Sequence, residues 1–130
     1  MDDAEAKARE LLKLAARNPK DPQYGDVVFE ANIILGKVAL RHGRKRASVR
    51  YLLAAAETPG SQQLRNGSIE MNLSRALVDW GERDAVAQFL ECMAPKTIQS
   101  KQFEDWAQQI RKGINPDLIP IFSGCSQSPC

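Results

Sequence analysis

Apolar residues recur every three or four positions along nearly the whole chain, and this periodicity constrains the fold more than any other feature. Such spacing places apolar side chains on one face of an α-helix. No stretch alternates apolar and polar residues for long enough to predict a strand. The pattern predicts an all-α fold of about six helices, over residues 2–18, 22–41, 45–57, 68–80, 83–93 and 101–112.

Start and stop signals frame the expected helices. Asp2 and Glu5 have the spacing of a capping box, Asp21-Pro22 offers a cap and a first-turn proline to the second helix, and Gly43 is placed to end that helix. The first and fourth helices are expected to turn one apolar face each toward the core. These faces are Ala4, Ala8, Leu11, Leu12 and Ala15 in the first helix, and Ile69, Leu73, Ala76, Leu77 and Trp80 in the fourth.

The chain also resembles itself when it is shifted. A shift of 38 residues places Leu35 on Leu73, Gly43 on Gly81, Ala47 on Ala85 and Leu52 on Leu90. A shift of 40 places Ala8 on Ser48, Leu12 on Leu52, Ala15 on Ala55 and Pro19 on Pro59. The repeating unit is therefore a pair of antiparallel helices, and such pairs bury their apolar faces by stacking.

This unit resembles the tetratricopeptide repeat (TPR). Leu35-Gly36, Gly43, Ser48, Leu52 and Ala55 have matching spacings, whereas Asn32 and Ala39 stand where large rings are usual. The resemblance covers about residues 4–93 as a degenerate motif, because both shifts exceed the usual ~34 residues. It implies a right-handed α-solenoid of stacked antiparallel helix pairs, with a TPR-like domain over residues 1–122 and a flexible tail over 123–130. Short repeat domains in bacterial proteins of unassigned role look similar.

The composition and the individual reactive residues argue against catalytic activity and metal binding. The net charge is only +2, from 18 Lys and Arg against 16 Asp and Glu, and the acidic N-terminus does not look like a secretory signal, so we expect a cytoplasmic protein. The three cysteines, Cys92, Cys125 and Cys130, form neither a disulfide framework nor a convincing metal site. His42 is the single histidine and has no orienting carboxylate nearby. We expect no enzymatic activity, no cofactor and no metal.

The basic run Arg44, Lys45 and Arg46 falls in the turn between the second and third helices, and the equivalent turn at 82–84 is acidic overall. We call these three residues the basic corner. A solvated turn accounts for them. They could also attach the chain to an anionic membrane or to a filament with acidic tails, as in adaptors resembling kinesin light chains. Nucleic acid is disfavoured, because Tyr51 is the one aromatic residue nearby.

A partner-binding groove is expected on the inner surface that the first helices of successive pairs line. Lys37 and Arg75 occupy equivalent positions there and could bind a carboxylate or an acidic peptide, while exposed Ile33 and Met71 would supply apolar contacts. Ordinary exposed polar residues remain the alternative. The candidate residues are Glu30, Ile33, Lys37, Arg41, Met71, Asn72, Arg75 and Asp79.

Two hypotheses follow from these features. In the first, the chain is a non-enzymatic scaffold that binds a peptide or partner protein on its concave face. In the second, it is an adaptor that attaches through the basic corner. The apolar residues Leu118, Ile119, Ile121 and Phe122 are expected either to fold back onto the last helix or to dock on another copy of the protein.

Overall fold

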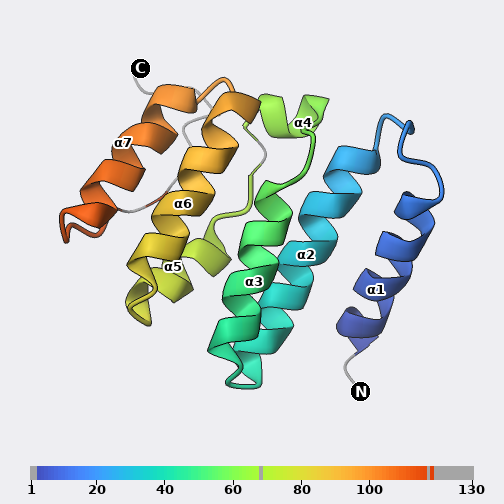
Figure 1. Cartoon of the computed structure of the whole chain (residues 1–130), viewed down its shortest axis with the longest axis horizontal. Coiled ribbons are helices and arrows are strands. Elements are labelled where there is room, and N and C mark those ends of the chain that lie inside the picture. The colour runs from blue at the N-terminus through green and yellow to red at the C-terminus, as the bar shows by residue number, and fades with distance from the viewer. Residues whose placement is uncertain (1–2, 68, 117, 119–130) are drawn as a thin grey trace. The chain divides into compact units, whose positions relative to one another are not determined.

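The structure is a computed structural model that describes residues 3–67, 69–116 and 118 (Figure 1). Every regular element in these ranges is a helix, so the all-α prediction is confirmed. Several residues used above lie outside the described ranges, namely Asp2, Ser68, Ile119, Ile121, Phe122, Cys125 and Cys130. The helices are α1 (Asp3–Ala16), α2 (Tyr24–Arg41), α3 (Lys45–Ala56), α4 (Gln62–Arg65), α5 (Asn72–Asp79), α6 (Arg83–Met93), the 3-10 helix η1 (Ala94–Lys96) and α7 (Ser100–Arg111).

The largest departure from the predicted boundaries lies between α3 and α5. The segment expected to be a loop contains α4, one turn of helix that buries Leu64. Gly67, with a φ of 102°, follows this turn, and α5 begins only at Asn72. Ile69 and Met71 are nevertheless buried. The apolar pattern therefore predicted burial correctly at Ile69 and helical conformation incorrectly, while Met71, expected on the exposed face, is buried.

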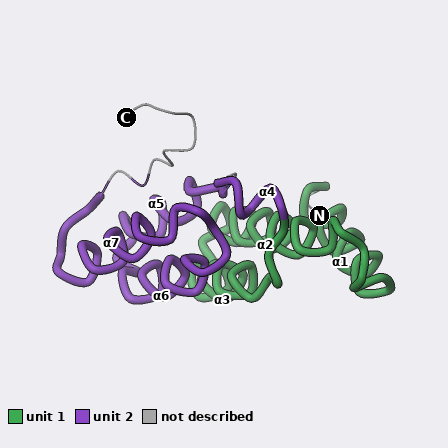
Figure 2. Tube along the Cα trace, turned by 90° about the horizontal axis from the view of Figure 1, so that it is seen from above, with its two compact units in different colours: residues 1–61 green, residues 62–130 purple. Residues whose placement is uncertain are grey.

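The chain divides into two units, residues 1–61 and 62–130, coloured separately in Figure 2. Unit 1 contains α1, α2 and α3, and each of these helices runs antiparallel to the one before it (Figure 1). Unit 2 contains α4 to α7, in which α6 packs against both α5 and α7. Within each unit the longer helices thus pack against the helices that precede or follow them in the chain.

The core of unit 1 joins α1 to α2 through small side chains. Ala8, Ala31 and Leu35 form a buried cluster, against which Leu12 and Tyr51 are partly buried. Among the described residues of α1, Ala8 is the one buried side chain. The predicted apolar face of this helix is therefore partly wrong, since Ala4 and Leu11 are exposed.

A close backbone contact holds the end of unit 1 against the start of α2. The Oγ1 atom of Thr58 donates a buried hydrogen bond of 2.7 Å to the carbonyl oxygen of Gly25. A Cβ atom at Gly25 would lie 1.9 Å from the carbonyl oxygen of Gly60, which glycine alone avoids. The residues that follow Gly25 and Gly60 are also in contact, because the hydroxyl of Ser61 donates to the carboxylate of Asp26. We call these contacts the α2 clasp.

Unit 2 has a core of larger side chains. Phe89, Leu90, Phe103 and Ile110 are fully buried between α6 and α7, and the rings of Phe103 and Trp106 lie 5.4 Å apart between centroids. Leu118 is also buried. Trp80, predicted on the core face of its helix, is instead 50% exposed, because it is the C-cap residue of α5, where the helix ends.

The turns within the two helix pairs have the same structure, 38 residues apart. The N–H of Arg44 donates to the carbonyl of Ala39 at 2.8 Å, and the N–H of Glu82 donates to the carbonyl of Leu77 at 2.9 Å. Between each donor and its helix lies a glycine in the left-handed region, Gly43 or Gly81. This is the Schellman arrangement that satisfies the last carbonyls of a helix. The two hairpins are thus locally equivalent, as the sequence shift predicts.

Candidate partner-binding site

The residues proposed for a groove divide between the two units. Glu30, Lys37 and Arg41 lie on α2, where Glu30 and Arg41 are exposed and Lys37 is half-buried. Asn72, Arg75 and Asp79 lie on α5 and are exposed, and the guanidinium of Arg75 donates a 2.7 Å hydrogen bond to the side chain of Asn72. The structure thus brings the residues of each helix together, and the pairing of Lys37 with Arg75 stays a prediction.

The apolar contacts expected in that groove are absent from the surface. Ile33 and Met71 are each only 3% exposed, so the expectation that they contact a partner was wrong. The reason at Ile33 is that α2 is buried around most of its circumference. Its buried positions are Gly25, Phe29, Ala31, Asn32, Ile33, Leu35, Gly36, Val38 and Ala39.

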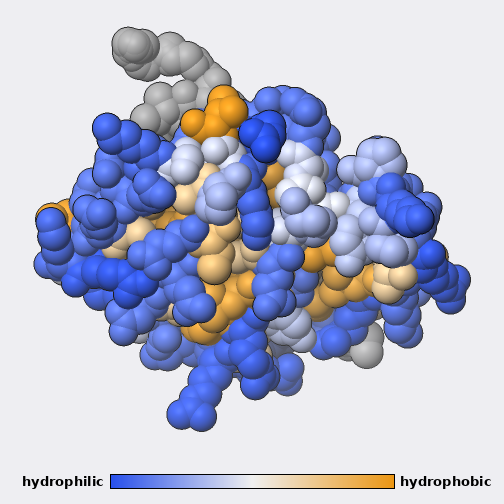
Figure 3. All heavy atoms as spheres, turned by 45° about the horizontal axis from the view of Figure 1, so that its top comes forward, coloured by the Kyte–Doolittle hydropathy of each residue, from blue (hydrophilic) through white to orange (hydrophobic). Residues whose placement is uncertain are grey.

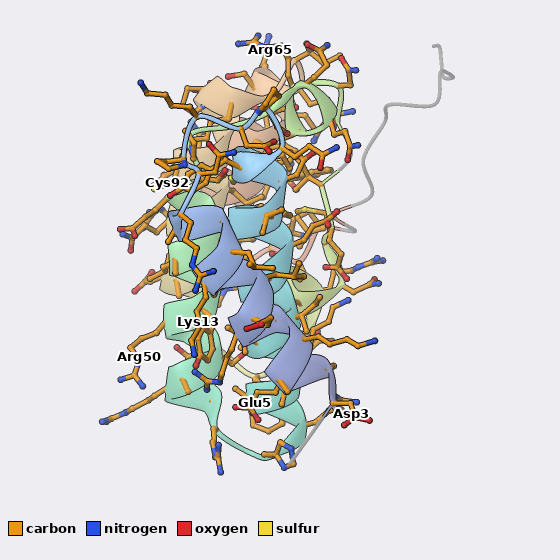
Figure 4. The ribbon with its side chains drawn as sticks, turned by 90° about the vertical axis from the view of Figure 1, so that its right-hand side faces the viewer. Asp3, Glu5, Lys13, Arg50, Arg65 and Cys92 are labelled. Atoms are coloured by element: carbon orange, nitrogen blue, oxygen red, sulfur yellow. The ribbon has the colours of Figure 1, made fainter. Side chains whose placement is uncertain are left out.

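The basic corner lies at the N-terminus of α3. Arg44 and Arg46 are exposed and Lys45 is half-buried, while Arg50 adds a fourth cation one turn beyond Arg46. In Figure 4 the labelled side chain of Arg50 projects away from α3. The first turn of α3 contains no acidic residue. Cations at a helix N-terminus oppose the helix dipole, so this arrangement is unfavourable for α3 itself.

A pocket that the sequence did not predict lies on unit 1, between α1 and α2. Its volume is about 160 Å³, and Leu11 and Leu14 on its α1 side are 43% and 51% exposed. Figure 3 shows hydrophobic side chains reaching the surface among hydrophilic ones over this part of the molecule. The residues that line the pocket are Leu11, Leu14, Ala15, Asn18, Asp21, Gln23, Tyr24 and Val27.

The connection from α1 to α2 contributes Asn18, Asp21 and Gln23 to the lining of this pocket. The N–H of Asn18 donates to the carbonyl of Ala15 at 3.0 Å, and the N–H of Tyr24 donates to the carbonyl of Asp21 at 2.9 Å. The carboxylate of Asp21 accepts a 2.7 Å bond from the N–H of Gln23, as in an Asx turn. The loop is therefore held by its own hydrogen bonds, which reduces the ordering cost of binding.

Charged side chains lie beside the pocket on the outer side of α1. Glu10, Lys13 and Arg17 are exposed. Arg9 lies on another face, where it donates to Glu5 at 2.8 Å and to the hydroxyl of Tyr51 on α3 at 3.3 Å. These contacts raise the pKa of Arg9, the hydrogen bond to Glu5 being the largest cause. Arg9 thus joins α1 to α3 and leaves the outer side of α1 to the other charges.

Sequence reasoning missed this pocket for a physical reason. Leu14 lies three residues after Leu11, which placed it on the flank of the predicted core face. Its partners Tyr24 and Val27 belong to the next helix, and their approach depends on the path of the loop. The signal that could have identified the pocket was the excess of leucines in α1, since Leu11, Leu12 and Leu14 cannot all face the core.

Comparisons with known proteins add no identification, because no protein-family model, curated protein or solved structure matches the chain. Among residues 3–67, 69–116 and 118, no group of three or more His, Cys, Asp or Glu side chains could hold a metal ion. None of the helices in these ranges is long and apolar enough to span a membrane.

Proposed function

We propose that the chain is a non-enzymatic protein-interaction module whose partner docks on the surface formed by α1 and α2. The observation that carries this proposal is the pocket flanked by Leu11 and Leu14, which are about half exposed. Neighbouring exposed apolar side chains on a charged surface are typical of a docking site. The proposal includes the TPR-like stacking of helix pairs and a cytoplasmic location, both of which rest on the sequence.

The energetics suit a modest contact that a larger interface extends. Complete burial of an exposed leucine is worth roughly 1.5–3 kcal/mol. Leu11 and Leu14 are already half covered, so together they contribute about 2 kcal/mol on docking. A helix laid beside α1 would also contact Tyr24 and Val27 across the pocket. In the same proposal Lys37 of α2 binds an acidic group of the peptide, and Arg75 of α5 is a separate candidate within unit 2.

A charge placed in the apolar surface tests the proposal. In a variant with Leu11→Asp and Leu14→Asp, we expect loss of the proteins that co-purify with the wild-type chain, measured by quantitative mass spectrometry after affinity purification from the native cell. Ile98→Asp is the matched control, because Ile98 is also strongly exposed but belongs to unit 2. Equal capture by the double variant and the wild type would contradict the site assignment.

The basic corner supports a second candidate function, attachment to an anionic membrane. The observation in its favour is that Arg44, Lys45 and Arg46 oppose the dipole of α3, which helix stability alone does not explain. Each cation near an anionic surface contributes about 1 kcal/mol. Co-sedimentation with phosphatidylserine vesicles should fall at high salt and in the triple Glu variant of the corner. Binding that is insensitive to both changes, or no binding at low salt, would remove the membrane form of this candidate.

A further inference from the structure

Helix α1 corresponds in sequence to α3, which is the second helix of the α2–α3 pair. The 40-residue shift aligns Ala8, Leu12 and Ala15 with Ser48, Leu52 and Ala55 of α3. Those three residues of α3 are buried, whereas in α1 only Ala8 is. Among the described helices, α3 follows an antiparallel partner, α2, in its own hairpin, and α1 has α2 on one side only (Figure 1). Leu11 and Leu14 of α1 are exposed, whereas the aligned Tyr51 and Ala54 of α3 are partly buried.

We infer that the surface at Leu11 and Leu14 packs against α1 of a second copy of the chain, which makes the protein a twofold symmetric dimer. The inference rests on the proposed function and names its partner. A twofold axis perpendicular to α1 makes the two helices antiparallel, as neighbouring helices of unit 1 are (Figure 1). Each α1 then supplies Leu11 and Leu14 to the contact.

The spacing of the leucines is self-complementary. Leu11 and Leu14 are three residues apart, as a and d positions of a heptad are. In an antiparallel pair, Leu11 of one copy faces Leu14 of the second copy, and the symmetry repeats this layer. Ala4, seven residues before Leu11, leaves room at the end of the contact. The two layers bury the leucines that unit 1 leaves half exposed.

Charge complementarity selects a second copy over an unrelated helix. Glu10 and Arg17 are seven residues apart, so they lie on one stripe beside the leucines, and both are exposed. When Leu11 faces Leu14 of the second copy, Glu10 comes beside Arg17 of the second copy. Symmetry generates the reciprocal pair, so one register satisfies both leucine layers and both ion pairs. A parallel arrangement would instead place Glu10 and Arg17 beside e positions, which in α1 are the alanines Ala8 and Ala15, and would form neither ion pair.

The mass of the full chain in solution tests the inference directly. We expect the weight-average mass from analytical ultracentrifugation to rise from 14.4 kDa toward twice that value as concentration increases. The contact is small, so we expect a dissociation constant on the order of 10–100 µM, typical of a weak interface. Leu14→Asp should keep the chain monomeric, and Ile98→Asp should leave the dimer unchanged. A wild-type chain that stays monomeric throughout this range would overturn the inference.

Charge reversal distinguishes this dimer from non-specific association. Glu10→Arg or Arg17→Glu alone creates two like-charge contacts per dimer and should weaken dimerisation about tenfold at low salt. The double variant, Glu10→Arg with Arg17→Glu, regenerates both pairs and should restore dimerisation. Lys13→Glu is the matched control, because Lys13 points away from the leucine stripe. A double variant no better than the single variants would overturn the pairing.

Crosslinking determines the orientation. In a background in which Cys92, Cys125 and Cys130 are replaced by serine, chains with Leu11→Cys and chains with Leu14→Cys are mixed and oxidised. The antiparallel dimer predicts mixed 11–14 disulfides, and predominant 11–11 and 14–14 disulfides would overturn it. Circular dichroism of each variant verifies that the helices are retained.

Failure of this inference and failure of the proposed function give different results. A chain that is monomeric at all concentrations, but loses a different co-purifying protein when Leu11 and Leu14 become aspartate, overturns the dimer and leaves the docking surface in place. A dimer that is insensitive to these two substitutions overturns the use of α1 for self-association.

Discussion

Helices α1 and α7 are similar in length, at 14 and 12 residues, and differ in how firmly they belong to their units. Helix α7 buries Phe103, Trp106, Ala107 and Ile110, whereas α1 buries Ala8 alone. Both helices have apolar residues at helical spacing. The difference lies in size, because aromatic side chains fill the contact of α7 and small side chains fill that of α1.

Polar contacts increase this difference. Arg83 at the start of α6 donates to the carbonyl oxygens of Ile110 and Ile114 at 2.9 and 2.6 Å, which satisfies the C-terminal end of α7. Arg111 of α7 also forms a 2.7 Å ion pair with Glu91 of α6. The corresponding contact of α1 is a 3.3 Å hydrogen bond from Arg9 to Tyr51. Helix α7 is thus bonded closely to its own unit, whereas α1 retains exposed apolar surface that is available for another contact.

The largest expected effect is in the core of α7. Phe103→Ala removes a fully buried ring and should lower the free energy of unfolding by about 3–5 kcal/mol. Leu12→Ala in the partly buried contact of α1 should cost about 1–2 kcal/mol, less than a fully buried leucine does. Urea denaturation followed by circular dichroism measures both. Equal losses would contradict the contrast between the two helices.

The next effect concerns the end of α7. Arg83→Met keeps a long apolar stem and removes the donors to Ile110 and Ile114, so it should destabilise unit 2 by about 1–3 kcal/mol. Hydrogen exchange should show increased opening at the last turn of α7. Arg111→Met, which removes the exposed ion pair with Glu91, serves as the comparison and should change stability by less than about 1 kcal/mol.

A smaller effect is expected at the surface of α1 that lines the pocket with α2. Leu14→Asp should lower the free energy of unfolding of the monomer by about 1–2 kcal/mol, because it removes the buried half of the leucine and places a carboxylate in the last turn of α1. The measurement is urea denaturation at a concentration low enough to exclude association. A loss of several kcal/mol would show that Leu14 belongs to the core of unit 1 and is unavailable for docking.

The smallest effect concerns pH. The hydrogen bonds of Arg9 with Glu5 and of Arg111 with Glu91 raise the pKa of each guanidinium above its ordinary value. A cationic group whose pKa is raised on folding stabilises the fold at every pH below its pKa in the unfolded chain. This stabilisation is lost only as the pH rises through the pKa of the group in the folded protein. A guanidinium is protonated throughout the ordinary pH range and the pKa of each of these two is raised further, so neither arginine should add pH dependence between about pH 6 and 10. The free energies of unfolding of Arg9→Met and of the wild type, measured by urea denaturation, should therefore differ by the same amount at every pH in that range.

The sequence predicted the helices better than it predicted the exposed surface. Periodicity located α2, α3, α6 and α7 to within two or three residues, and left-handed glycines such as Gly43 and Gly81 mark the C-terminal ends of helices. It could not decide which apolar residues remain exposed. Leu11 and Ile33 have the same kind of spacing, yet Leu11 is exposed and Ile33 is buried. That outcome depends on how many neighbours a helix has, which is a property of the tertiary structure.

The candidate site was predicted only in part. The polar members Lys37 and Arg75 were located on helices as expected, while the apolar contacts assigned to Ile33 and Met71 were not available. The pocket beside Leu14 depends on the hydrogen-bonded loop at residues 17–23, whose path the sequence pattern did not specify.

The α2 clasp has a consequence for how this chain tolerates changes of length. A Cβ atom at Gly25 would lie 1.9 Å from the carbonyl oxygen of Gly60, so the two backbones are in close contact. The segment from Thr58 to Ser61 therefore cannot lengthen without displacing the start of α2. An inserted residue at 58–60 should therefore be rejected by selection. Gene duplications or fusions that add or remove a helical pair would be accommodated after Ser61, where unit 1 ends.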